Sequence, residues 1–175
     1  LAGEMHATGP SRRTALLLGA SDTRAAQAVD LPAVAMARGV GKTRAEHEIY
    51  LVAIGRMART SLKLATVALN RNASRLSAGE SAIGWANIAL AASLALAPEA
   101  YDDWKRAAGA PLTWNQLEWK TRIALRRGDW KTVRTTIEAM PTQQHDEPVW
   151  TYWQGRALLA EGRREDAQAL FSRIA

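Results

Sequence analysis

The stretch LEWKTRIALRRGDWKTVRTTIEAMPTQQHDEPVWTYWQGRALLAEGRREDAQALF (residues 117–171) decides the fold, because it contains an internal repeat. Trp119 lies 34 residues before Trp153, and a further step of 34 residues toward the N-terminus reaches Trp85. Three of the seven tryptophans therefore share one register. The same offset relates further pairs: Arg122 and Arg156, Leu125 and Leu159, Gly128 and Gly162, Ile137 and Phe171.

A period of 34 residues is that of a two-helix unit that cannot bury its own apolar face and must stack on its neighbours. Gly155, Ala167 and Phe171 fall at the small, small and large positions of the tetratricopeptide pattern. We therefore predict an all-α fold, a right-handed superhelix of stacked helical hairpins resembling a tetratricopeptide solenoid. Since the last unit ends at Ala175 with an apolar face, we expect the chain to be a fragment of a larger protein.

Helix-start signals divide the 175 residues into two predicted domains. Residues 1–43 form an N-terminal segment with short helices, and residues 44–175 form the helical-repeat superhelix. Ser and Thr followed three residues later by Glu or Gln mark a capping box. We expect helix caps or helix starts at Ser21, Thr43, Ser77 with Glu80, Thr113 with Gln116, Asp129 and Pro148. We also expect a helix over residues 12–20 and a polar turn at residues 142–147.

The composition is that of a globular protein, with 47% hydrophobic and 23% charged residues and no apolar run long enough to span a bilayer. There is no cysteine, which excludes disulfides and thiolate metal sites. The net charge of +6 favours polyanionic partners, but the basic residues are spread along the chain without a dense block. Charge alone therefore does not predict nucleic-acid binding.

The sequence predicts no catalytic, cofactor-binding or metal-ligating residue. Gly41-Lys42-Thr43 resembles the end of a phosphate-binding loop, but Met36 stands where that motif needs glycine, so we interpret it as a turn between helices. His6, His47 and His145 lack partners at metal-ligand spacing and are interpreted as surface residues. No serine or threonine is paired with a base in a recognisable pattern.

The tryptophans offer aromatic faces on which sugars or bases stack. Trp85, Trp119 and Trp153 share a repeat position, so we predict that they pack in the core. The other three that we consider lie off that register and are predicted to be the better candidates for exposed surface: Trp104, Trp114 and Trp150.

Several segments resemble the helical superhelix of the soluble lytic murein transglycosylases. They are Glu118-Trp119 through Asp129-Trp130, then Met140-Pro141, and Trp150-Thr-Tyr152-Trp153 followed by Gly162-Arg163. The stretch from Leu76-Ser77 to Ala100 is similar as well. The resemblance covers roughly residues 44–175.

The resemblance implies a periplasmic protein of cell-wall turnover whose parent cleaves the MurNAc–GlcNAc bond of peptidoglycan and leaves 1,6-anhydroMurNAc ends. It implies two partners, the glycan strand and a C-terminal lysozyme-like domain of the same polypeptide, with no nucleic acid and no transmembrane segment. The catalytic glutamate of that family lies in a Glu-Ser motif, but Glu80-Ser81 is not followed by the family's next motif and is better explained as a helix cap. A tetratricopeptide-like module for protein–protein interaction is the alternative.

Overall fold

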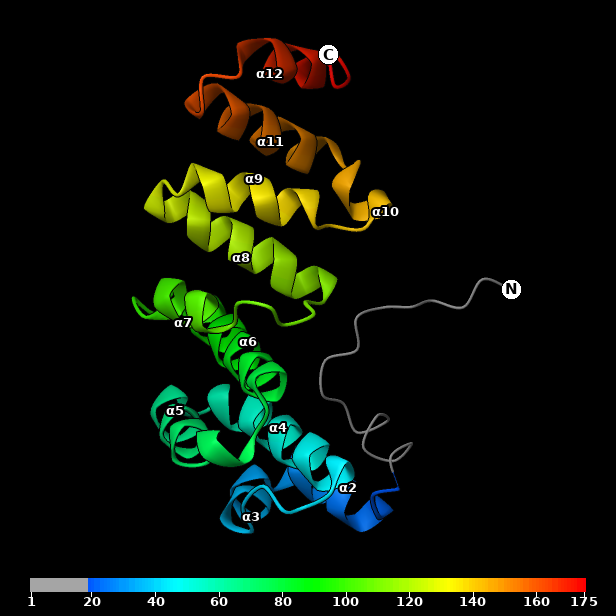
Figure 1. Cartoon of the computed structure of the whole chain (residues 1–175), viewed down its shortest axis with the longest axis vertical. Helices are drawn as coiled ribbons and strands as arrows, with labels where there is room; N and C mark the ends of the chain where they lie inside the picture. Colours follow the sequence, from blue (N-terminus) through cyan, green and yellow to red (C-terminus); the bar gives the residue numbers. More distant parts are fainter. Residues whose placement is uncertain (1–18) are drawn as a thin grey trace, which may run out of the picture. The chain divides into compact units, whose positions relative to one another are not determined.

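The computed structural model describes residues 19–175, which form helices and no strand (Figure 1). The all-α fold of stacked helical hairpins is therefore confirmed for this part of the chain. Most of the helix predicted over residues 12–20 lies outside the described residues. None of the described helices is long and apolar enough to cross a membrane. The elements are α2 (Asp22–Asp30), α3 (Pro32–Ala37), α4 (Arg44–Ala58), α5 (Leu62–Arg71), the 3₁₀ turn η1 (Ala73–Arg75), α6 (Ala78–Leu94), α7 (Ala100–Arg106), α8 (Trp114–Arg127), α9 (Trp130–Glu138), α10 (Thr142–His145), α11 (Pro148–Ala160) and α12 (Arg164–Phe171).

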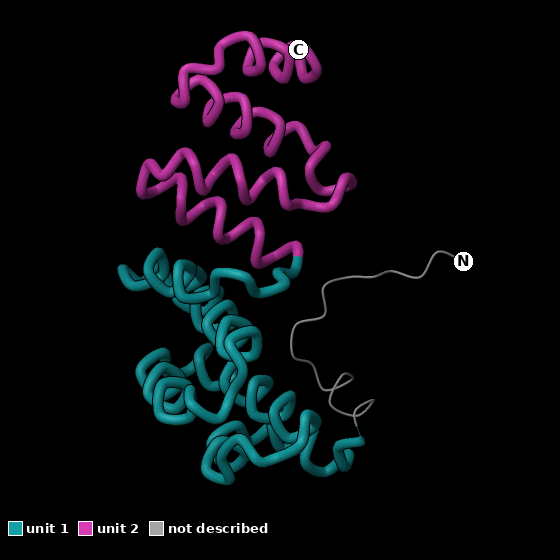
Figure 2. Tube along the Cα trace, viewed as in Figure 1, with its two compact units in different colours: residues 1–113 teal, residues 114–175 magenta. Residues whose placement is uncertain are grey.

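The described part of the chain forms two compact units, which divide between Thr113 and Trp114 (Figure 2). The boundary falls in the segment that follows α7, where Gly109 adopts a φ of 83° and Pro111 follows. Glycine and proline together break a helix and suit a connection between units. The domain division that we predicted after residue 43 is at a different place from this boundary and stays a prediction.

Capping side chains start the helices of the first unit. Ser21 caps α2 and Ser61 caps α5, each accepting a hydrogen bond from a backbone amide three residues on. Ser77 and Glu80 form the predicted capping box of α6. Thr43 caps α4 as predicted and also forms a box with Glu46, a Thr-x-x-Glu signal that our sequence analysis overlooked. The Gly41-Lys42-Thr43 stretch is thus the turn between helices that we expected.

Glu46 receives an unusual number of hydrogen bonds at this turn. The backbone amides of Lys42 and Thr43 donate to one carboxylate oxygen at 2.8 and 3.0 Å, and Arg24 pairs with the other at 3.1 Å. These amides, with the Thr43 hydroxyl and then Arg24, lower the pKa of Glu46 from 4.5 to about 2. Gly41 leaves room for this arrangement, because a Cβ there would lie 2.5 Å from the Cβ of Glu46.

The lowered pKa of Glu46 leads to a prediction about the stability of the fold at low pH. Because its folded-state pKa is depressed, the charged carboxylate stabilises the fold above about pH 4.5, and that contribution is lost as the pH falls toward 2. We expect Glu46→Gln to lower the melting temperature at pH 7 and to flatten its decline between pH 4.5 and 2. The measurement is thermal unfolding by circular dichroism across that range. Asp30→Asn is the control, since no described residue pairs with Asp30; an equal flattening in both variants would contradict the assignment.

The core of the first unit lies between α4, α5 and α6. Tyr50, Ile54 and Leu69 are fully buried there, and Ile88 contributes from α6. The Tyr50 hydroxyl donates to the carbonyl of Ala68 at 2.8 Å, so its polar end is satisfied inside the core. The helices pack in sequence order, with α2 and α3 on α4, α4 on α5 and α6, and α6 on α7.

In the second unit, α8 packs on α9, α9 on α11, and α11 on α12. Asp129 caps α9 as predicted, accepting from the Thr132 amide at 3.1 Å. Gly128 and Gly162, at equivalent repeat positions, have φ values of 68° and 81°. That left-handed conformation favours glycine, which explains why both repeats need it after the first helix.

The prediction of a polar turn at residues 142–147 was only partly right, because residues 142–145 form the short helix α10. Pro141 sets its start, and Gln144 lies fully buried rather than facing solvent. The Gln144 amide donates to the Trp114 carbonyl at 3.0 Å and lies 3.3 Å from a Glu118 carboxylate oxygen. Hydrogen bonds across 26 and 30 residues have no local sequence signal.

Burial of the tryptophans reverses part of the sequence prediction. Trp85 is buried as expected, but Trp119 and Trp153 are only partly buried. Trp104 and Trp150, predicted to be exposed, are only 4% and 2% exposed, and that prediction was wrong. A repeat register shows that positions are equivalent along the chain, whereas burial depends on which neighbouring helix covers each face.

Candidate functional site

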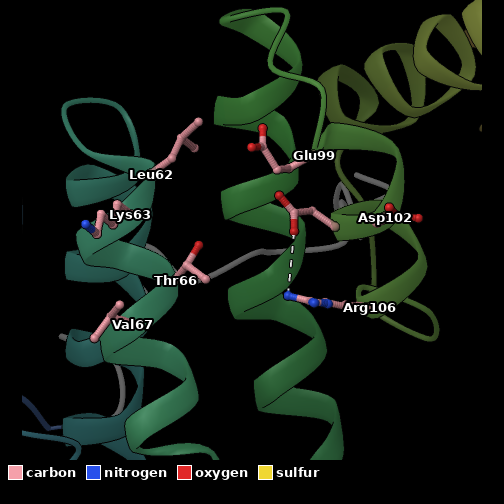
Figure 3. Close-up of a pocket in the computed structure, with 8 residues that line it drawn as sticks. Leu62, Lys63, Thr66, Val67, Glu99, Asp102 and Arg106 are labelled. Atoms are coloured by element: carbon pink, nitrogen blue, oxygen red, sulfur yellow. Dashed lines mark ion pairs between the residues drawn. The ribbon is translucent and has the colours of Figure 1, made fainter.

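A groove of about 540 Å³ lies between α5 and α7 in the first unit (Figure 3). Leu62 and Thr66 lie on its α5 side, and Glu99 and Arg106 lie on its α7 side, as Figure 3 shows. Helix α6 packs against both α5 and α7 and holds the two sides apart. The other lining residues are Lys63, Val67, Asp102 and Asp103.

Trp104 fixes α7 on α6 and thereby sets the geometry of the groove. Its indole is 4% exposed, and its N–H donates to the Ser93 hydroxyl at 2.9 Å. The Ser93 hydroxyl, fully buried in α6, donates a hydrogen bond in turn to the Ala89 carbonyl at 2.6 Å. This satisfied chain of hydrogen bonds specifies how α7 lies on α6.

Charges of both signs line the α7 side. Asp103 is buried, and burial raises the pKa of its carboxyl. Arg106 approaches Asp103 at 4.0 Å and also lies over the Trp85 ring, 4.5 Å from its centroid. Asp102 is exposed and pairs with Lys105 at 3.4 Å. Because these pairs are long or exposed, most of the charged groups keep hydrogen-bonding capacity for a ligand.

The groove is chemically suited to binding. Carboxylates accept and ammonium or guanidinium groups donate hydrogen bonds, so the lining matches a ligand rich in hydroxyl and amide groups. Thr66 is the one hydroxyl among the lining residues, and no described carboxylate or histidine is hydrogen-bonded to it. No group of three or more potential ligands among residues 19–175 could hold a metal ion. Among the described residues, Thr66 therefore has no hydrogen-bonded base of the kind that activates a hydroxyl nucleophile.

His47 is not the ordinary surface histidine that we predicted. Its Nδ1 lies 2.8 Å from a Glu80 carboxylate oxygen, and the side chain is only 18% exposed. Burial works against the charged form of Glu80, but hydrogen bonds from the Ser77 amide and His47 outweigh it and lower its pKa. Glu80 therefore caps α6 and also ties it to α4, which fits the structural role that we assigned to it. His145 pairs with Asp146 at 3.2 Å, and His6 lies outside the described residues.

The second unit presents aromatic rings interleaved with arginines. The Arg122 guanidinium lies over two rings, 5.2 Å from the Trp119 centroid and 5.4 Å from the Trp150 centroid, and pairs with Glu118 at 3.0 Å. Tyr152 is 38% exposed and was not among the aromatic residues that we predicted to face solvent. Its hydroxyl accepts a hydrogen bond from Arg156 at 3.0 Å. Sequence periodicity gives no sign that Tyr152, rather than Trp153, faces solvent.

Fold and site together define a helical-repeat protein with a groove of mixed polar and apolar lining between α5 and α7. Neither a protein-family model nor a curated protein sequence matches the chain. Among solved structures, the chain is similar in fold to the X-ray structure of an inactive mutant of the lytic transglycosylase Slt from Pseudomonas aeruginosa, with a TM-score of 0.63 and 23% identity. The likeness covers 94% of this chain and 28% of that protein. This likeness shows that the chain shares the helical fold of that part of the neighbour.

Proposed function

We propose that this chain is a helical scaffold domain of a peptidoglycan lytic transglycosylase and forms part of the wall along which a glycan strand is held. The observation that carries the proposal is the fold likeness to lytic transglycosylase Slt over 94% of the chain. The sequence segments around Trp119, Trp130 and Trp153 also support it, since they resemble the helical superhelix of the soluble lytic murein transglycosylases.

The groove between α5 and α7 supports the proposal at the level of chemistry. A glycan strand with peptide stems carries hydroxyl, amide, carboxylate and amine groups. The mixed lining of Lys63, Thr66, Glu99 and Arg106 offers donors and acceptors for each of them. The chain's net charge of +6 adds long-range attraction to stem carboxylates.

The location and partners follow from the same proposal. The chain acts in the periplasm, where the glycan strands of peptidoglycan lie. Its second partner is a C-terminal lysozyme-like domain of the same polypeptide, which supplies the cleavage chemistry. The chain itself contributes binding and positioning, with no catalytic residue of its own.

Cosedimentation with purified sacculi tests the proposal. We expect the chain to pellet with sacculi, less at 500 mM than at 50 mM salt, because the charge attraction is screened (the Debye length falls to about 3 Å near 1 M). Thr66→Glu, which fills the groove, is expected to reduce the bound fraction about threefold relative to Thr135→Glu. The control adds the same charge at an exposed position of α9.

Three results would contradict the proposal. Equal binding by the two variants would show that the groove does not contact the glycan. Absence of any binding to sacculi would show that the chain is not a glycan-binding scaffold. Release of 1,6-anhydro-muropeptides from sacculi by the chain alone would show catalysis, which a scaffold does not perform. Circular dichroism of both variants establishes that each is folded before binding is compared.

A further inference from the structure

A second groove, of about 440 Å³, lies between α3, α4 and α5 on the first unit, and its lining is different in kind. Most of its lining is apolar, including Met36, Met57, Leu64 and Val67. Leu64 and Val67 are 56% and 46% exposed, so the groove is open along α5. Nothing in the described structure covers the exposed side chain of Leu64.

The polar groups in the groove are already satisfied, except for one cation. The Tyr50 hydroxyl donates to Ala68 and accepts from the Asn72 amide at 2.9 Å, and that amide also donates to the Ala68 carbonyl at 3.0 Å. Arg71 lines the groove, and no described residue forms an ion pair or hydrogen bond with its side chain. A sugar needs many hydrogen-bonding partners, which this groove does not supply.

The charge around the groove is one-sided. Residues 31–75 contain eight Lys and Arg and two Glu, a net charge of +6 that equals the net charge of the whole chain. No acid lines the groove, and Glu46 is held by the Lys42 and Thr43 amides and by Arg24. The guanidinium of Arg75 lies 4.0 Å from where a Cβ of the groove residue Gly39 would stand. An apolar floor with a basic edge is complementary to an apolar face with an acidic edge.

We propose that the groove between α3 and α5 docks an acidic amphipathic helix of a partner protein. Such a helix places apolar side chains at i, i+3, i+4 and i+7 in an apolar groove and leaves its flanking acids beside the rim. Met36 and Met57 suit this mode, since unbranched thioether side chains adapt to the shape of a partner. A drug-sized ligand is normally enclosed over 70–90% of its surface, which an open groove does not provide. A flat bilayer surface would leave the hollow unfilled.

Fluorescence anisotropy with three labelled synthetic peptides of the same length tests the proposal on the whole chain. The first has Leu at helical spacing and Glu on the flanks; the second replaces Glu by Lys; the third scrambles the first. We expect the first to bind at least tenfold more tightly than the other two. Leu64→Gln combined with Met36→Gln, both of which line only this groove, should weaken it about tenfold, and Arg71→Glu should weaken it and reduce its salt dependence.

Leu94→Gln is the matched control, because Leu94 is 47% exposed and lies outside the groove; it should leave the affinity unchanged. Equal affinity for the three peptides, no binding of the first, or equal loss in the control and groove variants would overturn the proposal. Flotation with vesicles containing phosphatidylglycerol is the second arm. Flotation that the Leu64 and Met36 changes abolish, with no peptide binding, would assign the groove to a membrane surface instead. This outcome is independent of sacculus binding, which concerns the α5–α7 groove.

Discussion

Replacing Trp104 by alanine is expected to lower the free energy of unfolding of the first unit by about 3–5 kcal/mol, the range for truncating a buried aromatic side chain. The indole is 4% exposed between α6 and α7, so the change removes apolar contacts and leaves a cavity. It also deprives the Ser93 hydroxyl of its donor. Urea unfolding of the whole chain, followed by circular dichroism, measures the loss.

Two variants separate the contributions within this prediction. Trp104→Phe keeps much of the apolar volume but removes the N–H, so we expect an intermediate loss, of about 1–3 kcal/mol. Tyr152→Ala removes an aromatic side chain that is 38% exposed and should cost much less. If Trp104→Ala cost no more than Tyr152→Ala, Trp104 would not be the anchor of α7. Because α7 forms one side of the α5–α7 groove, the proposed function predicts that Trp104→Ala also reduces cosedimentation with sacculi.

Replacing Gly155 by leucine is expected to destabilise the hairpin of α11 and α12 by about 1–3 kcal/mol or more through overpacking. A Cβ at this position would lie 2.6 Å from a ring atom of Phe171, so even alanine must displace the ring. We expect Gly155→Ala to destabilise the hairpin despite the gain in helix propensity of about 1 kcal/mol that alanine gives. Hydrogen exchange of amides in α11 and α12 localises the effect.

The contact between Gly155 and Phe171 makes this prediction specific. In the double variant Gly155→Ala with Phe171→Leu, the smaller side chain should relieve the crowding, so the two changes should be non-additive by more than about 0.5 kcal/mol. Gly79→Ala is the control, because no atom lies within 4 Å of a Cβ at that position in the first turn of α6. Gly79→Ala should be neutral or stabilising. An equal loss in Gly79→Ala and Gly155→Ala would contradict the packing argument.

The sequence by itself determined the helical fold and most helix boundaries of this protein, because those signals are local. Ser77 with Glu80, Asp129 and Pro148 each satisfy or remove backbone donors within one turn, and Gly128 and Gly162 supply the left-handed backbone that ends a helix. The repeat also placed Gly155 and Phe171 at the small and large positions of the tetratricopeptide pattern, and the structure brings these two residues into close contact.

Only the tertiary structure decided which side chains meet across the helices. The pairing of His47 with Glu80 joins residues 33 apart, and Gln144 reaches Trp114 across 30. Trp104 is buried and Trp153 is only partly buried, and no local sequence pattern distinguishes the two. Their burial depends instead on which neighbouring helix covers each side chain. Both grooves flank α5 for the same reason: their walls come from helices whose distance apart is set by packing on α4 and α6, which composition and periodicity do not encode.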